Sequence, residues 1–195
     1  MAASVVAICN IALGMMGNSS SIESLDERSH QAQQMRRFYN PGRRAALEMH
    51  DWSFARKRQA LAEHSVEPPD GVWGYRYQSP QDMLVARRLW VPHWVDKEPY
   101  EIEVVEDMRT ILTNLPEAVL IYTYDCEAVT LWPSSFDLVV ARHIAKLASP
   151  TLETRKAVGA HETLLAGDFN RARIADANQQ ADRAPRDSEM VTGRN

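Results

Sequence analysis

The stretch His50-Asp51-Trp52-Ser53-Phe54-Ala55 marks the point where the sequence changes from helical to strand-like patterning. Before it, apolar residues recur at helical spacing; after it, short apolar runs alternate with turns as far as Trp132. Helical spacing returns after Pro133. This order predicts an α+β fold, mainly α, in which helices from both ends of the chain form an antiparallel bundle with an inserted antiparallel β-sheet region.

Two helices are predicted on the N-terminal side of this stretch, over residues 4–16 and 26–50. Gly17 ends the first, as glycine commonly does. Pro41 interrupts the second, and because proline lacks a backbone donor and crowds the preceding turn, we expect a kink or a short break near Asn40.

Residues 55–132 form the predicted strand-rich insert. Its clearest turn is Pro68-Pro69-Asp70-Gly71. Its clearest strand covers residues 100–105, where apolar residues alternate with Glu101 and Glu103, so Ile102 and Val104 are expected on a buried face.

Two further helices are predicted over residues 134–149 and 152–179, separated at Ser149-Pro150. About 28 helical residues extend about 42 Å, so the last helix is expected either to break at Gly167 or to project from the body. Residues 1–179 thus form one predicted domain. Residues 180–195 are polar, have little to bury and form an extended C-terminal tail.

Composition narrows the class of protein. The 195 residues are 45% hydrophobic and 25% charged, with a net charge of -4, which excludes a wholly disordered chain, a collagen-like repeat and a disulfide scaffold. Bulk attraction to nucleic acid or membrane is not indicated. Cys9 and Cys126 are far apart, and Cys9 is expected as a buried thiol in a reducing compartment. The apolar N-terminal segment lacks the basic start of a signal peptide and is too short to span a bilayer.

Catalytic and metal-binding patterns are scarce in the sequence. The glycines form no phosphate-binding loop, and the six histidines form no pair at i, i+4. Asp125-Cys126-Glu127 brings two carboxylates and a thiol together, which favours an exposed turn over a catalytic group. We therefore expect no catalytic residue, no cofactor and no metal site.

Adjacent basic residues occur beside aromatic ones, and they leave three interpretations open. Such segments bind single-stranded nucleic acid, pack arginine stems on aromatic rings, or form subunit interfaces. The negative net charge favours packing. The segments are Arg36-Arg37, Arg43-Arg44, Arg56-Lys57-Arg58 and Arg87-Arg88.

A family resemblance rests on the order of several short motifs. They are Ile11-Ala12-Leu13-Gly14, Ile22-Glu23-Ser24-Leu25-Asp26, Arg37-Phe38-Tyr39, Ala46-Leu47, His50 to Ala55, Trp73-Gly74-Tyr75-Arg76-Tyr77 and Pro80-Gln81-Asp82-Met83-Leu84. In this order and spacing the chain resembles the head-to-tail adaptor of short-tailed bacteriophages, the tail tubular protein A family. Met83 stands where the family more often has cysteine. The resemblance covers residues 8–89 well and the later helices more loosely.

The resemblance implies a structural virion protein at the portal vertex of the tail, made in the host bacterial cytoplasm. Members of the family form a twelve-subunit ring that joins the portal protein to the tail nozzle protein (tail tubular protein B), with tail fibres attached around the junction. The ring continues the channel for genomic DNA without sequence-specific binding, and no membrane is involved. A nucleic-acid-binding protein is the alternative function, and an enzyme is the least favoured.

Two sets of residues have predicted roles, one in the core and one in portal binding. Five aromatic residues lie where helices give way to strands and are expected to form a core that joins the two regions: Trp52, Phe54, Trp73, Tyr75 and Tyr77. The resemblance implies that the tail holds the portal, and the predicted portal-binding residues are Arg183, Arg186, Met190, Val191 and Arg194.

Overall fold

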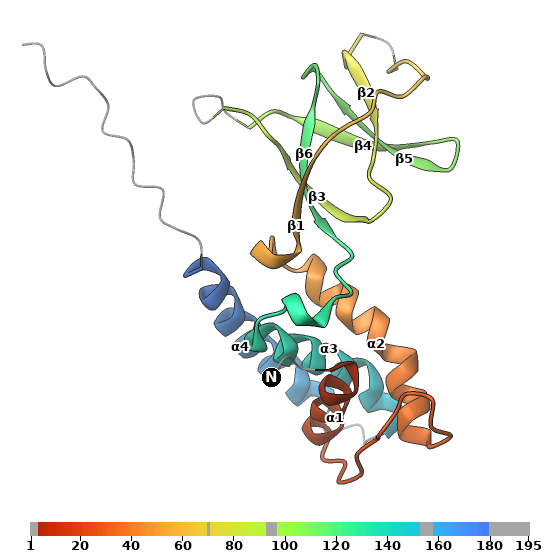
Figure 1. The fold of residues 1–195 in the computed structure, drawn as a ribbon, viewed down its shortest axis with the longest axis vertical. Coiled ribbons are helices and arrows are strands. Elements are labelled where there is room, and N and C mark those ends of the chain that lie inside the picture. The colour runs from red at the N-terminus through yellow and green to blue at the C-terminus, as the bar shows by residue number, and fades with distance from the viewer. Residues whose placement is uncertain (1–3, 70, 93–96, 153–157, 180–195) are drawn as a thin grey trace, which may run out of the picture.

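The computed structural model describes residues 4–69, 71–92, 97–152 and 158–179 and shows a mixed α+β fold (Figure 1). The helices of these residues lie at one end of the molecule, and the strands form two small antiparallel sheets at the other. We call these ends the helical region (residues 5–48 and 134–177) and the strand region (residues 56–124). The predicted α+β class is confirmed.

The first helix, α1 (Val5–Met15), begins where predicted because Ser4 caps it: the Ser4 hydroxyl accepts a hydrogen bond from the Ala7 amide at 3.1 Å. Asn10 is a polar residue within an otherwise apolar helix, and its side chain makes two hydrogen bonds to the backbone of the following loop. It donates to the Ile22 carbonyl and accepts from the Ile22 amide, both at 2.9 Å. Asn10 therefore fixes the following loop against α1.

The second helix, α2 (His30–Glu48), is shorter than the predicted 26–50 and has no break at Pro41. It begins late because the Glu27 carboxylate accepts hydrogen bonds from the amides of Glu23 and Ser24, which holds residues 23–27 in a turn. Ser29 then caps the helix, accepting from the Ala32 amide at 3.2 Å. Pro41 costs the helix one backbone hydrogen bond. The next residue, Gly42, packs closely against Ile144, and this tertiary contact holds the chain in the helix past the proline.

The two later helices also differ from prediction. α3 (Ser134–Leu152) continues through Pro150, and α4 (Val158–Ala177) runs through Gly167 without a break. On either side of Pro150, hydroxyl groups bond back to the helix: Ser149 Oγ donates to the Ala145 carbonyl, and Thr151 Oγ1 to the Ala148 carbonyl, both at 2.7 Å. The predicted residues 153–157 lie outside the described residues.

α3 is the central element of the helical region, since it contacts α1, α2 and α4. Its approach to α2 is very close. A Cβ atom built on Gly42 would lie 2.8 Å from Ile144 Cγ1 and 3.1 Å from the Ile144 backbone nitrogen, so only glycine fits at this position. The large core formed here contains residues of all four helices together with Trp52.

The strand region consists of two three-stranded sheets. The first has the order β1 (Arg56–Ala60), β6 (Val119–Tyr124), β3 (Met83–Leu89), and the second has the order β2 (Tyr75–Gln78), β5 (Met108–Thr113), β4 (Tyr100–Val105). The short helices η1 (Ser53–Ala55) and η2 (Val129–Leu131) connect this region to α2 and α3. Because β1 pairs with β6, the chain enters and leaves the region on neighbouring strands.

The sheets enclose a second, smaller core to which both contribute, including Tyr77 and Ile111 from one sheet and Leu120 and Tyr122 from the other. On one side the backbone joins them. Beyond β1, the Ala62 carbonyl accepts from the Gln78 amide, and the His64 amide donates to the Arg76 carbonyl, both at 2.8 Å.

The prediction that Ile102 and Val104 lie on a buried face is wrong. These side chains are 44% and 65% exposed. The alternation of the sequence is real, but β4 is the end strand of its sheet, so the side chains of β4 have a neighbouring strand on one side only. No helix of the described residues is long and apolar enough to cross a membrane.

Candidate functional site

The helical and strand regions meet at a polar junction, which begins with Arg43 on α2. The Arg43 side chain is only 1% exposed. Its guanidinium donates to the Asp125 carboxylate and to the Cys126 carbonyl, the latter at 3.1 Å, and lies 3.4 Å from Glu127 Oε1. A buried guanidinium needs such partners, because an unpaired charge in the interior is very costly. Arg43 therefore holds α2 against the segment that follows β6.

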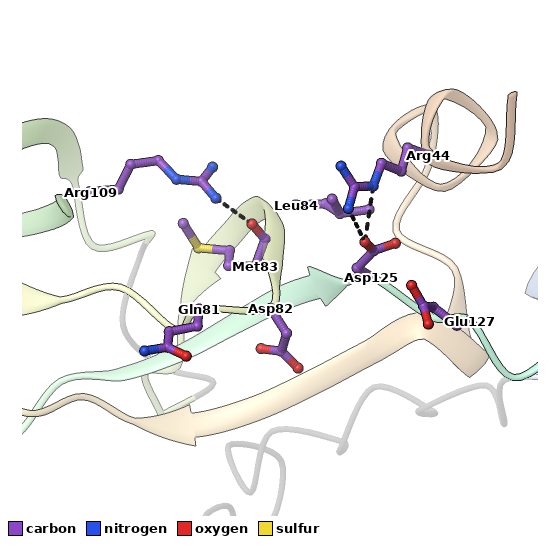
Figure 2. A pocket seen from close by; sticks show the side chains of 8 residues that line it. All are labelled: Arg44, Gln81, Asp82, Met83, Leu84, Arg109, Asp125 and Glu127. Carbon is purple, nitrogen blue, oxygen red and sulfur yellow. Dashed lines mark hydrogen bonds and ion pairs between the residues drawn. The ribbon is translucent and has the colours of Figure 1, made fainter. Parts of the chain in front are cut away.

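A pocket of about 400 Å³ lies beside this contact (Figure 2). Arg44 forms one wall and pairs with Asp125 at 2.7 Å, while Arg109 on the other side donates to the Met83 carbonyl at 2.6 Å. Asp82 also lines the pocket, but Lys57 pairs with its carboxylate at 2.6 Å. Since the charged side chains of its walls pair with one another, with neighbouring side chains or with the backbone, the pocket suits a joint between two regions better than a reaction centre.

Arg87 of β3 forms the second part of the junction. Its guanidinium donates to the carbonyls of Leu47, Glu48 and His50 at 3.3, 3.1 and 2.7 Å and to Thr123 Oγ1 at 2.8 Å. Carbonyls at a helix C-terminus lack partners within the helix, and a cation there also interacts favourably with the helix dipole. Arg87 thus fixes the C-terminal end of α2 to the strand region.

In the pairs Arg43-Arg44 and Arg87-Arg88, the first residue is more buried and joins the two regions, while the second is exposed. Arg44 and Arg88 are 56% and 51% exposed and form ion pairs with Asp125 and Asp51. The sequence singled out these arginines but did not reveal their roles, since Arg43 and Asp125 are 82 residues apart. The only signal for these arginines in the sequence was that adjacent basic residues lie beside aromatic ones.

A serine, a histidine and an aspartate come together between η1 and α4. Asp176 of α4 accepts hydrogen bonds from the Ser53 hydroxyl and, at 3.0 Å, from the Ser53 amide, and His50 Nε2 lies 3.8 Å from its carboxylate. In a catalytic triad the serine would donate to the histidine. Here the serine donates to the aspartate, so the arrangement caps η1 and attaches α4 to it.

Asp125-Cys126-Glu127 has a structural arrangement as well. Both carboxylates contact Arg43, while Cys126 is buried and its sulfur accepts a hydrogen bond from the Tyr124 hydroxyl at 3.2 Å. Cys9 is also a buried free thiol, as predicted, and burial raises its pKa to about 12.

The five aromatic residues predicted to form one joining core lie in different places. Trp52 is buried in the helical core, where Phe54 packs beside it. Tyr77 is buried in the strand core, with Tyr75 stacked on it at 6.0 Å between ring centroids. Trp73 lies outside both clusters, and its indole donates to Glu101 at 3.3 Å. The structure does not bring these five residues together. The polar contacts of Arg43 and Arg87 connect the two regions instead.

Two titratable groups on α3 have strongly shifted pKa values. Burial raises the pKa of Asp137 to about 6. His143 lies with Nε2 2.9 Å from the sulfur of Met49, and burial, assisted by the charge of Lys146, lowers the pKa of His143 to about 4. At neutral pH, His143 is therefore uncharged and Asp137 is ionised in a buried position.

The predicted portal-binding residues Arg183, Arg186, Met190, Val191 and Arg194 lie outside the described residues. Among the residues that the structure does describe, no group of three or more histidine, cysteine, aspartate or glutamate side chains is arranged to hold a metal ion.

No family model matches the chain, and no curated protein matches it.

Proposed function

We propose that this protein is a structural virion component, the head-to-tail adaptor that joins the portal to the tail nozzle and continues the DNA channel. The support is the order and spacing of the motifs between residues 8 and 89, which resemble the tail tubular protein A family. In the proposal the helices form an antiparallel bundle, the strand region is an insert, and copies of the chain form a ring. No reaction is assigned to it.

The arrangement of the described polar residues supports an assembly role. Arg43 and Arg87 join α2 to the strand region, and Asp176 attaches α4 to η1. A rigid connection between two regions suits a protein whose work is to bind neighbours on several sides. Portal protein, nozzle protein, tail fibre and further copies of the chain are the proposed partners.

The proposal assigns portal binding to residues 180–195, with Met190 and Val191 as apolar contacts and the three arginines as polar ones. Deleting residues 183–195 is expected to leave the melting temperature nearly unchanged and to abolish attachment to the portal. Co-sedimentation and negative-stain imaging with purified portal test this directly. A ring stacked on the portal supports the proposal, and equal portal binding by truncated and full-length protein contradicts the assignment to the tail.

A second candidate function, binding of single-stranded nucleic acid, is favoured by one contact. Arg58 lies over the ring of Trp90 at 5.3 Å, and Trp90 is 44% exposed. Exposed aromatic rings beside arginine stack on bases. Salt-sensitive binding of a single-stranded oligonucleotide that is lost in Trp90→Ala would support this function, with Trp73→Ala as the control.

A further inference from the structure

The strand region has one side on which the sheets are not joined by backbone hydrogen bonds among the described residues. β3 and β4 are end strands of their sheets, and a side-chain contact between them lies on this side. Side chains connect the two sheets here: the Tyr100 hydroxyl of β4 donates to the Ala86 carbonyl of β3 at 3.0 Å, and Arg109 of β5 donates to the Met83 carbonyl of β3 at 2.6 Å. We call this the open side. In Figure 1 the β4–β5 hairpin reaches outward from the rest of the strand region.

Among the described residues, no strand pairs with the outer edge of the β4 backbone. The turn between β4 and β5 consists of Glu106 and Asp107, both with positive φ, and Val105 and Met108 close it. In an antiparallel ladder, pairs alternate between bonded and non-bonded, so Val105, Glu103 and Glu101 bond to β5. The amide and carbonyl groups of the alternate residues therefore point to the outer edge: Tyr100, Ile102 and Val104.

The same edge carries exposed apolar side chains. Ile102 lies opposite Ile111, which is fully buried in the strand core, so Ile102 and Val104 share the face that is turned toward that core. They remain 44% and 65% exposed. A strand added beside β4 would cover both side chains while it satisfied the backbone groups of the edge.

The charges around β4 indicate what kind of strand could pair with its outer edge. Residues 98–107 contain five acidic side chains and no basic one: Glu98, Glu101, Glu103, Glu106 and Asp107. A second copy of β4, paired antiparallel, would place these acidic residues opposite one another, which is destabilising. No described strand of this chain combines exposed basic residues with alternating large apolar ones; β1, for example, reads Arg-Lys-Arg-Gln-Ala.

From these observations we propose that the outer edge of β4 binds an extended segment of another protein in which lysine or arginine alternates with apolar residues. The segment adds a strand to the second sheet. Its apolar side chains contact Ile102 and Val104. Its basic side chains lie on the opposite face, near Glu101, which also accepts from the Trp73 indole, and near Glu103, which also pairs with Arg76 at 2.8 Å. This goes beyond the proposed adaptor function and does not depend on it.

A fluorescent peptide, long enough to cover β4 and alternating lysine or arginine with valine, tests the proposal by anisotropy with the full-length protein. One control peptide has the same composition with its basic residues grouped at one end, and another has glutamate in place of each basic residue. We expect the alternating peptide to bind about tenfold or more tightly than either control. Amide exchange should show protection at Tyr100, Ile102 and Val104.

Variants of the protein locate the site. Replacing both Ile102 and Val104 by threonine should weaken peptide binding about tenfold, whereas Ile174→Thr, at a similarly exposed apolar position on α4, should not change it. Glu101→Lys provides a second variant that leaves the apolar pair intact and should also weaken binding. Equal binding of the alternating and grouped peptides would overturn the proposal, as would the absence of binding. Self-association that the double threonine variant abolishes would make a second copy the occupant and would also overturn it.

Discussion

The helical and strand regions each have a core, and the two cores are closed to different degrees. The helical core gathers large side chains from all four helices around Trp52, whose ring contacts Phe136 edge-on at 5.0 Å between centroids. The strand core is smaller and has an open side at which Ile102 and Val104 remain exposed. The free energy gained by burial scales with the apolar area removed from water, so we expect most of the stability of the fold to come from the helical region. The exposed edge of the strand region is then free to bind a partner.

The strongest test of this comparison is Trp52→Ala. Truncating a fully buried tryptophan typically costs about 3–5 kcal/mol, and the indole also donates to the Ala46 carbonyl at 2.9 Å. For a chain of this length we expect the melting temperature to fall by roughly 10 °C. Trp73→Ala serves as the control, because Trp73 lies outside both cores. Similar melting temperatures for the two variants would show that the helical core does not dominate stability.

The connection between the regions is tested by Arg43→Met. This change keeps much of the volume of the side chain but leaves Asp125 and the Cys126 carbonyl without their buried donor. We expect a loss of about 3 kcal/mol in the free energy of unfolding, at the lower end for a broken buried pair, since Asp125 is partly exposed.

Arg44→Met is the matched control for this prediction. Its side chain is 56% exposed and pairs with the same Asp125. An exposed pair contributes about 0–1 kcal/mol, so urea denaturation should separate the two variants clearly. Equal losses would mean that Arg43 does not join the regions.

A smaller effect is expected from Asp137, which has one carboxylate oxygen without a hydrogen-bond partner among the described residues. Burial raises its pKa to about 6, above the value of about 3.9 in an unfolded chain. The folded state therefore holds the proton more tightly, and the stability that this contributes is lost as pH rises from about 4 through 6.

Asp137→Asn removes this penalty. At pH 7 we expect the variant to be more stable than the unmodified protein by about 1–2 kcal/mol, with the difference shrinking toward zero at pH 4. Chemical denaturation at several pH values measures it. A difference that does not depend on pH would argue against a buried ionised carboxylate at this position.

The smallest effect is expected on the open side. Val104→Thr replaces a side chain that is already mostly exposed by another β-branched one, so the free energy of unfolding should change by less than about 0.5 kcal/mol. Ile111→Thr, directly across from Ile102 but fully buried, is the contrasting variant and should be strongly destabilising. If Val104→Thr were equally costly, the edge of β4 would be part of a closed core.

Local patterns predicted much of the fold. The strand at residues 100–105 lies where alternation indicated it, within the predicted strand-rich insert. The helices were less well predicted at prolines, because Pro41 and Pro150 are accommodated by packing and by hydroxyl groups that no local pattern reveals. The exposure of Ile102 could not be predicted either, since alternation identifies a face of a strand but not its place in a sheet.

The residues of the junction were visible as arginine pairs, but their partners were not. Asp51, which is near in sequence, pairs with Arg56 at 2.8 Å. Asp125 and Asp82 come from far along the chain, and only the folded structure brings them to Arg43 and Lys57. A pattern of basic residues predicts that the partners are acidic, but only the fold determines which acidic residues these are.

The pairing of β1 with β6 has a consequence for the order of folding. α2 and α3 pack closely together, yet the chain from Met49 to Pro133 separates them, and closing so long a loop is entropically costly. Once Arg56 lies opposite Thr123, the two ends of that loop are already adjacent. We therefore expect the strand region to form early and the contact of α2 with α3 to follow, with refolding slowed by these distant pairings.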